Sequence, residues 1–386
     1  MAKVHTVYLF TTQPACDFEN NSGPHFPDNV VIVSSYGDQG YRSILSKLPD
    51  RLSDALHFRI LRRQFSGISN SYFLKGYPTL LKTLRYVKPD IVYYENLESM
   101  VLFSAFVKKG LPAARQIYDA HNVDSNLWRQ LANAQNNTEY NTYFKTALKN
   151  EKQLYKMVNA VFCCSKPDQQ IFINLNNCLV NSCVIPNGVD TVEKRFDPNP
   201  DKYLSLEILF CGGLDYYPNQ EGIRWFYDKV FPLVQSSIPG IRLILVGKAP
   251  LIQKSISVEQ DPSVEIIGMV TDVKPFYNRA SVCIAPLLSG SGTRLKILEA
   301  MSMGNPVVAT SIGAEGIAYA DGENILIADS PEIFAVQIIK LLSDKALFEN
   351  LRFEAWKMVN ERYEWSKIGL QVNESIEKLL ILPNAS

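Results

Sequence analysis

Short runs of β-branched and aromatic residues alternate with longer amphipathic stretches along this chain, and the series runs twice. Such short strands joined by helices predict parallel sheets covered on both faces. Because 386 residues exceed what one core usually organises, we expect two α/β domains. The runs predict strands at 30–33, 90–94, 116–119, 161–164 and 183–186 in the first half, and at 206–210, 242–246, 264–267, 281–285 and 306–309 in the second.

A stretch rich in Pro, Asn and Asp, residues 186–202, separates the two series and shows little periodicity. It predicts the interdomain linker, with one domain over 1–188 and the other over 189–363, and residues 190–201 as a hinge. In doubly wound sheets, ligands bind beyond the carboxyl ends of the strands. Two such domains facing each other therefore predict a cleft between them.

Charge and cysteine usage limit the function classes. The 39 basic and 39 acidic residues balance, which argues against a nucleic-acid partner. Residues 1–190 hold 20 Lys/Arg against 15 Asp/Glu, so this half is basic. Two readings of it stay open: a peripheral contact with anionic lipids on the inner face of the membrane, or an ordinary charged surface. The basic side chains concerned are Arg62, Arg63, Lys82, Arg85, Lys88, Lys108 and Lys109.

Seven cysteines without a CxxC pair indicate a reduced compartment. The first ten residues lack a signal-peptide layout and read as a strand, and no apolar run approaches ~18 residues. These features predict a cytoplasmic protein.

The segment 289–304 carries the strongest functional pattern: a loop of small residues opens a short helix. Such a helix start offers backbone N–H groups to an anion, and Arg294 and Lys296 add positive charge there. Glu299 follows roughly 7.5 Å along the helix axis from Arg294, about the distance from a diphosphate to the ribose of a nucleotide. The pattern suits a nucleotide-sugar, although an ordinary loop before a helix has the same composition.

Several segments in a fixed order resemble the family 4 glycosyltransferases, which have the GT-B architecture of two facing Rossmann-like, doubly wound parallel-sheet domains. The match runs from about Asp90 to Trp365. Its segments are Tyr118–Ser125, Glu151 before Ala160–Ser165, Val184–Asp190, Leu209–Asn219, Gly268–Val273 and Ala285–Leu287, followed by the 289–304 motif. After Tyr363, a helix to about 382 resembles the family's closing element, which packs back on the N-terminal domain.

The resemblance implies a donor site for a nucleotide-sugar, mostly on the C-terminal domain. It implies that Gly212 and Gly213 allow close approach of the backbone to the donor, and that Gly292 and Thr293 bind the diphosphate. It also implies that Glu299 contacts the ribose and that Asn187 lies in a turn bordering the cleft. The alternative interpretation of Gly212–Gly213, and likewise of Asn187, is a purely structural turn.

His121 is the catalytic candidate, since it follows the strand 116–119 and matches the family histidine that contacts the transferring sugar. On its own, a single His after a strand is more often structural. His5, His25 and His57 lack ligand-like spacing and the chain has no Asp-x-Asp, so we expect neither a metal nor a cofactor. Positive side chains and helix ends must then stabilise the leaving diphosphate.

Three departures from the family pattern stand out. Ser291 occupies the place of the first glutamate of the paired-glutamate signature. Gly213 and the neighbourhood of Gln220 stand where many relatives carry Arg and Lys, and our hypothesis is that Arg294 and Lys296 replace that charge. The family's glycine-rich loop after the first strand is absent, because residues 11–24 contain only Gly23.

The resemblance implies transfer from a nucleoside-diphosphate sugar to an acceptor hydroxyl with retention of configuration, in glycan, polysaccharide or glycolipid biosynthesis. Sugar, lipid-linked and polypeptide acceptors all remain open. Two alternatives keep the same fold: a nucleotide-sugar-binding protein without turnover, motivated by Ser291 and Gly213, or an enzyme for epimerisation or phosphorolysis.

Overall fold

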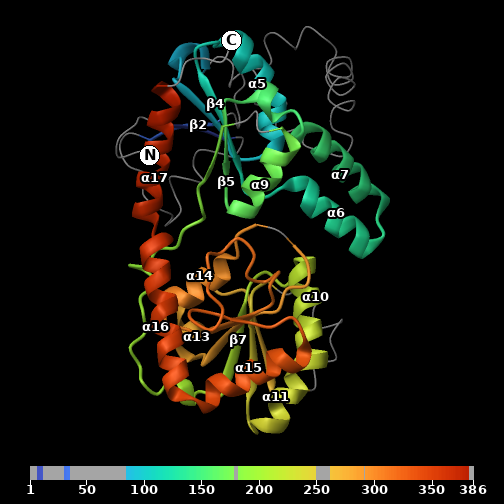
Figure 1. The fold of residues 1–386 in the computed structure, drawn as a ribbon, viewed down its shortest axis with the longest axis vertical. Helices are drawn as coiled ribbons and strands as arrows, with labels where there is room; N and C mark the ends of the chain where they lie inside the picture. Colours follow the sequence, from blue (N-terminus) through green and yellow to red (C-terminus); the bar gives the residue numbers. More distant parts are fainter. Residues whose placement is uncertain are drawn as a thin grey trace. The chain divides into compact units, whose positions relative to one another are not determined.

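The structure is a computed structural model that describes residues 7–11, 30–34, 84–177, 181–248, 261–290 and 292–381 (Figure 1). Its contacts divide the chain into two compact units. The first comprises Met1–Phe162, Gln170–Cys183 and Val372–Ser386, and the second comprises Cys163–Gln169 and Val184–Gln371. The domain bounds expected from the sequence stay a prediction, because a compact unit and an independently folding domain are different properties.

The first unit is built on parallel strands. Strands β1 (Val7–Thr11) and β2 (Val30–Ser34) pair in parallel, with Val7 opposite Val30. A four-stranded sheet has the order β3-β4-β5-β6, formed by β3 (Ile91–Tyr94), β4 (Arg115–Ala120), β5 (Ala160–Cys163) and β6 (Asn181–Val184). All four residues of β5 are buried, as expected for a strand of a parallel sheet covered on both faces.

Helices join these strands, and their ends follow from local sequence. Asn96 caps α5 (Leu97–Gly110) by accepting a hydrogen bond from the Ser99 amide at 2.8 Å. Helices α6 (Asp124–Gln135) and α7 (Thr138–Glu151) form a hairpin, since Asn136 is in the left-handed conformation (φ 48°) and Asn137 caps α7. The short α8 (Leu154–Met157) and α9 (Lys166–Leu175) follow.

The second unit contains a six-stranded sheet in the order β12-β11-β10-β7-β8-β9, with parallel pairing throughout. In chain order this is the 3-2-1-4-5-6 arrangement of the Rossmann fold, whose ligand crevice lies between the first and fourth strands. Here those strands are β7 and β10. The strands are β7 (Glu207–Cys211), β8 (Arg242–Val246), β9 (Val264–Gly268), β10 (Val282–Ala285), β11 (Val307–Ala309) and β12 (Leu326–Ile327).

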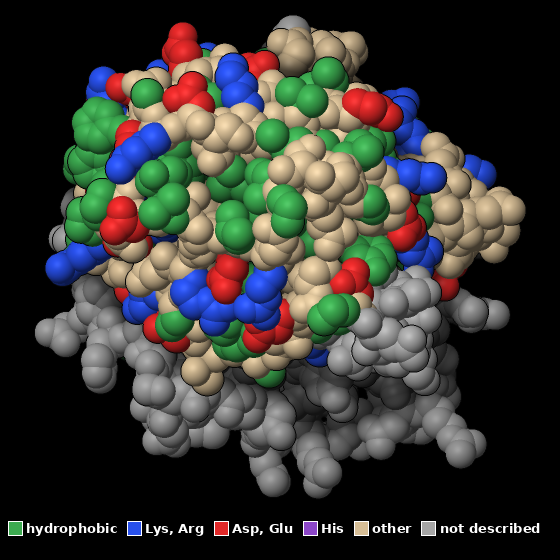
Figure 2. Space-filling view, turned by 90° about the horizontal axis from the view of Figure 1, so that it is seen from below, with side chains coloured by type: hydrophobic (Ala, Val, Ile, Leu, Met, Phe, Trp, Pro, Cys, Tyr) green, Lys and Arg blue, Asp and Glu red, His purple; other side chains and the backbone are tan. Residues whose placement is uncertain are grey.

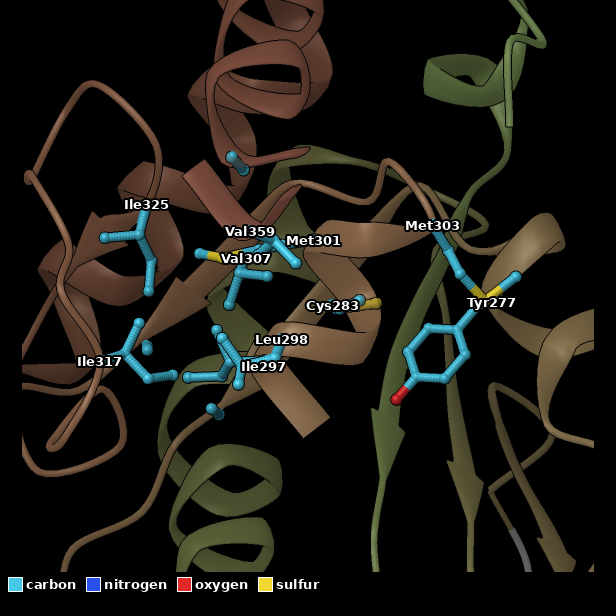
Figure 3. Packing of buried hydrophobic residues seen from close by; sticks show 14 of the residues in the cluster. Tyr277, Cys283, Ile297, Leu298, Met301, Met303, Val307, Ile317, Ile325 and Val359 are labelled. Carbon is cyan, nitrogen blue, oxygen red and sulfur yellow. The ribbon is translucent and has the colours of Figure 1, made fainter. Parts of the chain in front are cut away.

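Alternate residues of the central strands feed two hydrophobic clusters. Ile208 and Phe210 of β7 belong to one cluster, and Leu209 between them belongs to the other. In the second cluster, Leu298 and Met301 of α14 (Leu295–Ser302) pack with Val359 of α16 (Lys345–Arg362) (Figure 3). The sheet is therefore buried on both faces, and α14 is fixed to it by its apolar side.

The remaining helices of this unit connect and cover the strands (Figure 1). The described ones are η2 (Lys202–Leu204), α10 (Tyr217–Trp225), the π-helix η3 (Phe226–Val230), α11 (Phe231–Ser237), α13 (Lys274–Arg279) and α15 (Pro331–Ser343). Helix α17 (Trp365–Ile381) begins in the second unit, and its residues from Val372 onward belong to the first.

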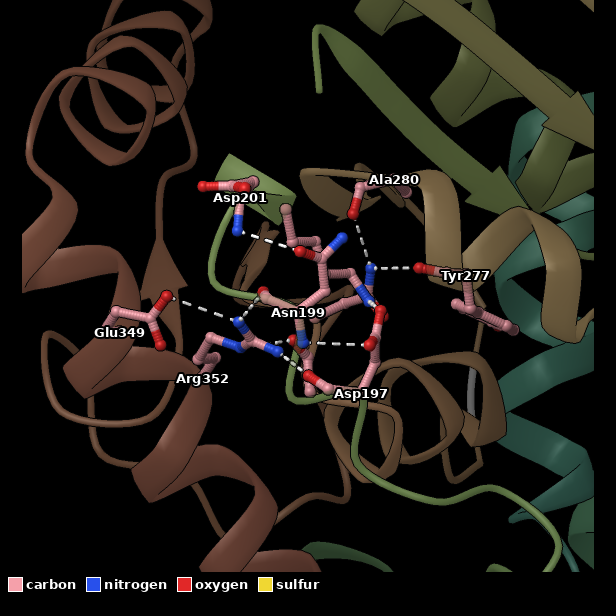
Figure 4. Close-up of polar contacts among 10 residues, drawn as sticks. Asp197, Asn199, Asp201, Tyr277, Ala280, Glu349 and Arg352 are labelled. Atoms are coloured by element: carbon pink, nitrogen blue, oxygen red, sulfur yellow. Dashed lines mark hydrogen bonds and ion pairs between the residues drawn. The ribbon is translucent and has the colours of Figure 1, made fainter. Parts of the chain in front are cut away.

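The predicted linker is anchored within the second unit by a buried arginine. Arg352, which is 1% exposed, donates to the carbonyl oxygens of Gly304, Asn199 and Asp197 (Figure 4). Lys202, also 1% exposed, donates to Asn305 Oδ1 at 3.2 Å. These contacts hold residues 197–202 against the body of the unit, which argues against the expected hinge at 190–201.

All ten strands predicted from the two series are present, with β6 displaced two residues toward the N-terminus and β12 added. Among the described residues, no helix combines the length and the apolar character needed to cross a membrane. The face of the second unit in Figure 2 carries hydrophobic side chains interspersed with polar and charged ones, as is ordinary for a protein surface.

Candidate donor site and comparison with known proteins

Helix α14 starts beyond the carboxyl end of β10, next to the Rossmann crevice, and no side chain caps it. Gly292 and Thr293 lie immediately before Arg294, the residue at the N-cap position. The Thr293 hydroxyl is buried and has no hydrogen-bond partner among the described residues. An uncapped helix start beside an unsatisfied hydroxyl is suited to an anion with several oxygen atoms.

Arg294 is only 6% exposed, and its guanidinium donates to the Ile312 carbonyl oxygen at 3.4 Å. Gly290 makes room for it, because a Cβ at that position would lie 3.3 Å from both terminal nitrogens and φ is +109°. Burial lowers the pKa of Arg294, while the nearby Glu315 and Asp168 oppose that shift. The site thus contains a largely desolvated cation.

Lys296 is the second residue of α14, two residues after Arg294, and other side chains surround its ammonium group. Its ammonium donates to Asn219 Oδ1 at 2.7 Å and lies 4.0 Å from the ring centroid of Phe210. The space where a Cβ of Gly212 would stand is 2.9 Å from Lys296 Nζ, so the absent side chain of Gly212 admits the ammonium. Burial, reinforced by the charge of Arg294, lowers the pKa of Lys296 to about 7.

The turn after β7 is organised by Asn219 of α10. Its Nδ2 donates to the Gly213 carbonyl oxygen at 2.6 Å, while its Oδ1 accepts from Lys296. Asn219 therefore joins the glycine turn after β7 to the start of α14. Asn219 lies in one of the segments that resemble the family, but the sequence did not predict this role. Its position two residues into α10, after the Gly-Gly turn, is the signal that was available.

Glu299 lies further along α14, and its side chain is 28% exposed. One carboxylate oxygen forms an ion pair with Lys194, and the other accepts from the Tyr277 hydroxyl at 3.4 Å. Neither partner was anticipated, because Lys194 lies 105 residues away in the chain and the sequence carries no local pattern joining them.

His121 belongs to the first unit, where it is exposed just after β4. Two carboxyl groups flank it. Burial raises the pKa of Asp124 to about 6, and the charge of His121 opposes the shift. Burial likewise raises the pKa of Asp119, with hydrogen bonding from Tyr93 and the charge of His121 acting the other way. His121 is thus an accessible imidazole with two acids close by.

The start of α6, just beyond His121, is capped from a distance. Val123 at the N-cap position offers no side-chain bond, and Glu151 at the end of α7 accepts instead from the Ser125 amide at 3.1 Å. Glu151 is fully buried, and burial raises its pKa to about 7. Glu151 belongs to the pattern that resembles the family, but its capping of the helix that follows His121 was not predicted from the sequence.

The structure brings Gly212, Gly213, Arg294, Lys296 and Glu299 together around β7 and α14 of the second unit. Asn187, in the same unit, donates to the Cys164 sulfur at 3.6 Å. Ser291, which replaces the first family glutamate, lies outside the described residues, as do the residues between 11 and 30.

No group of three or more His, Cys, Asp or Glu side chains suited to a metal ion occurs within the described part of the chain. Of the basic residues considered for membrane contact, Arg85, Lys88, Lys108 and Lys109 are exposed, and the others lie outside the described residues.

Part of the second unit is similar to a family of known proteins. Residues 205–344 match the model of the glycosyl transferases group 1. A protein from the cps region of Klebsiella pneumoniae, itself uncharacterised, is 26% identical over 90% of each chain. A phosphatidyl-myo-inositol mannosyltransferase of Mycobacterium leprae is 27% identical over 49% of this chain and 51% of its own length. The alignment with the mannosyltransferase thus spans about half of each protein.

The fold also matches solved structures. Anabaena HepE in complex with UDP has a TM-score of 0.66 with 15% identity, over 96% of this chain and all of that chain. The likeness extends across both parallel-sheet units, which gives the GT-B fold expected from the sequence. Over residues 205–344 the chain is thus similar to the glycosyl transferases group 1, and across both units it has the fold of a solved structure that binds UDP.

Proposed function

We propose that this protein is a glycosyltransferase that takes its sugar from a nucleoside-diphosphate sugar, with the diphosphate at the start of α14. The observation that carries the proposal is a pair of cations, the buried Arg294 and the half-buried Lys296, at an uncapped helix start beside the unsatisfied Thr293 hydroxyl. A helix N-terminus and two desolvated cations suit a diphosphate better than a neutral ligand. HepE, a neighbour in fold, was solved with UDP, which makes UDP the first nucleotide to test.

In the proposed reaction the bond between the sugar and the diphosphate breaks, and the acceptor hydroxyl attacks the same face of the sugar, so that configuration is retained. Arg294, Lys296 and the α14 amides stabilise the negative charge on the leaving diphosphate. Glu299 accepts hydrogen bonds from the pentose, and His121 contacts the sugar being transferred. Under this proposal the positive charge comes from the protein, without a metal ion or cofactor.

The acceptor is a hydroxyl on a sugar, a lipid-linked glycan or a polypeptide, in the biosynthesis of a glycan, polysaccharide or glycolipid. We place the enzyme in the cytoplasm, on the inner membrane face if its basic residues contact anionic lipid. Lys108 and Lys109, exposed at the end of α5, support such a contact. Flotation with vesicles of neutral or anionic lipid tests it. If the protein binds neither vesicle type, the proposed membrane contact is wrong, and the proposed donor site is not affected by that result.

The central test measures binding of UDP, GDP, ADP and CDP by calorimetry, followed by hydrolysis and transfer assays with the matching nucleotide-sugars. We compare R294A/K296A with K229A/K340A, which removes two exposed cations of the same unit. Since hydrogen bonds to charged groups contribute about 1.5–3 kcal/mol each, the first pair should weaken binding by about 100-fold or more, and the control should not.

Two results would contradict the proposal. Equal nucleotide affinity in R294A/K296A and the wild-type protein would show that the diphosphate does not bind at the start of α14. Binding without hydrolysis or transfer for any donor and acceptor tried would favour a nucleotide-sugar-binding protein over an enzyme. Retention is tested separately, by the anomeric configuration of the product in NMR spectra.

A further inference from the structure

The carboxylate of Glu299 is held from two sides before any ligand arrives. Lys194 forms an ion pair with Oε1, and the Tyr277 hydroxyl shares its one proton between Oε2 at 3.4 Å and the Lys296 carbonyl oxygen at 3.5 Å. The side chains of Lys194 and Glu299 are 15% and 28% exposed, so water screens this pair less than a surface pair. Tyr277 is 1% exposed, and it belongs to the hydrophobic cluster that contains Leu298 and Met301 of α14 (Figure 3).

Lys194 is itself fixed to the end of the helix that carries Glu299. Its carbonyl oxygen accepts from the Ser302 hydroxyl of α14, and its amide donates to the Asp190 carbonyl oxygen at 2.9 Å. A few residues on, the Asp197 amide donates to the Met303 carbonyl oxygen at 3.2 Å, and Asp197 is also held by Arg352. The backbone of Lys194 is therefore held against α14 by hydrogen bonds, and the ion pair with Glu299 has to order only the side chain of Lys194.

The hydrogen-bonding capacity left on Glu299 matches a pentose. An ionised carboxylate has about four lone-pair positions and only accepts. Lys194 takes one position and Tyr277 another, which leaves about two, one for each of two neighbouring hydroxyl donors. If the carboxylate turned away from a ligand, it would lose the Lys194 ion pair and the weaker Tyr277 contact, so the fold restrains its orientation mainly through Lys194.

We propose that Lys194 and Tyr277 are positioning residues that orient Glu299, so that the donor site selects a nucleotide with both ribose hydroxyls. The inference rests on the proposed function, in which Glu299 faces the pentose. It assigns a functional role to the segment between the two strand series, which the sequence analysis treated as a linker. Lys194 and Tyr277 act through Glu299 and need not touch the sugar.

The test compares the affinities of a nucleoside diphosphate and its 2′-deoxy form, using UDP or whichever diphosphate binds wild-type protein. The wild type should prefer the ribose form by about tenfold or more, since one lost hydrogen bond to a charged group is worth about that factor. K194M should lose most of this preference, because it weakens the ribose form, which uses both hydroxyls, more than the deoxy form, which uses only the 3′-hydroxyl. K194R should restore part of it, and Y277F should reduce the preference less.

K274M is the matched control. Lys274 is a half-buried lysine of the same unit that pairs with Glu193, next to Lys194 in the chain, so its loss changes the charge equally without touching Glu299. It should keep the wild-type preference. Thermal unfolding of each variant identifies loss of fold, and if K194M unfolds, K194R and Y277F still carry the test.

A ribose-to-deoxy ratio that is unchanged in K194M and Y277F would overturn the inference. A uniform loss of affinity for both nucleotides would also overturn it, because that result indicates a purely structural or long-range electrostatic role. If no nucleoside diphosphate binds the wild-type protein, the proposed function fails instead. The two failures are therefore distinguishable.

Discussion

Glu151 allows a quantitative prediction about stability in the first unit. It is 0% exposed, and its Oε1 accepts from the Ser125 amide at 3.1 Å. Its Oε2 is buried with no hydrogen-bond partner among the described residues. Asn176 donates to the Glu151 carbonyl oxygen at 2.8 Å, and its own Oδ1 is likewise a buried acceptor without a donor. Burial raises the pKa of Glu151 from 4.5 to about 7, and hydrogen bonds from Ser125 and the Asp124 backbone offset only part of that shift.

The sign follows from which form the fold prefers. Because the pKa is higher in the folded than in the unfolded state, folding favours the protonated acid. The stabilisation is complete below pH 4.5 and is lost as the pH rises through about 7. The interval between these two pKa values corresponds to about 3 kcal/mol of unfolding free energy at 1.36 kcal/mol per unit.

The perturbation is E151Q, which keeps one acceptor oxygen for the Ser125 amide and cannot ionise. Between about pH 4 and pH 8, the unfolding free energy of E151Q relative to the wild type should move by about 3 kcal/mol in favour of the variant. Any constant cost of fitting the amide cancels in this comparison across pH.

Urea unfolding at several pH values provides the assay, with Trp128 fluorescence as the reporter for the first unit. The other three tryptophans, Trp225, Trp356 and Trp365, belong to the second unit and are replaced by Phe in both proteins. E377Q, an exposed glutamate of α17 in the first unit, is the control and should show no such trend. A difference between E151Q and the wild type that stays constant across pH would refute the reasoning.

Three further predictions concern the second unit. At about pH 8, binding of a nucleoside diphosphate should take up close to one proton, because a bound anion raises the pKa of Lys296 from about 7. Calorimetry in two buffers of different ionisation enthalpy should detect this uptake, and K296M should abolish it. Equal binding heats in both buffers for the wild type would contradict the prediction. G247A should destabilise the unit by at least about 3 kcal/mol, because φ is +145° there and the new Cβ would lie 1.9 Å from the Gly212 carbonyl oxygen. G369A should instead stabilise the unit by about 0.5–1 kcal/mol, because Gly369 lies in α17 and its Cβ would meet open space. Similar melting temperatures for these two variants would count against that account. R352M should cost about 3–5 kcal/mol, because it removes three hydrogen bonds from a buried guanidinium and strands the buried Gly304 carbonyl oxygen, and R352K should recover little of it. A melting temperature near that of the wild type in R352M would show that this network is dispensable.

Much of the fold could be predicted because its signals are local. Runs such as 242–246 and 281–285 are apolar on both sides of the strand, which only a doubly covered parallel sheet requires. The helix start at Arg294 was equally visible, since small residues followed by an apolar helix pattern mark it. Strand β12 was missed because two residues carry almost no periodicity.

The surroundings of the candidate site could not be predicted in the same way. Glu299 was identified from its place on α14, but Lys194 reaches it only because residues 190–202 fold back onto that helix. The same stretch looked like a linker, since Pro and Asn interrupt any period, and its anchoring depends on Arg352, more than 150 residues further along the chain.

The sequence by itself determined two doubly covered parallel sheets, a charged helix start after β10 and the identity of the cations beside it, because hydrophobic period and residue type are properties of neighbouring residues. Only the tertiary structure decided that Asn219 clamps Lys296, that Lys194 pairs with Glu299, and that Glu151 caps α6. These contacts and the pKa shifts of the buried groups depend on which distant residues exclude water from a site, and such desolvation is not encoded in any local pattern.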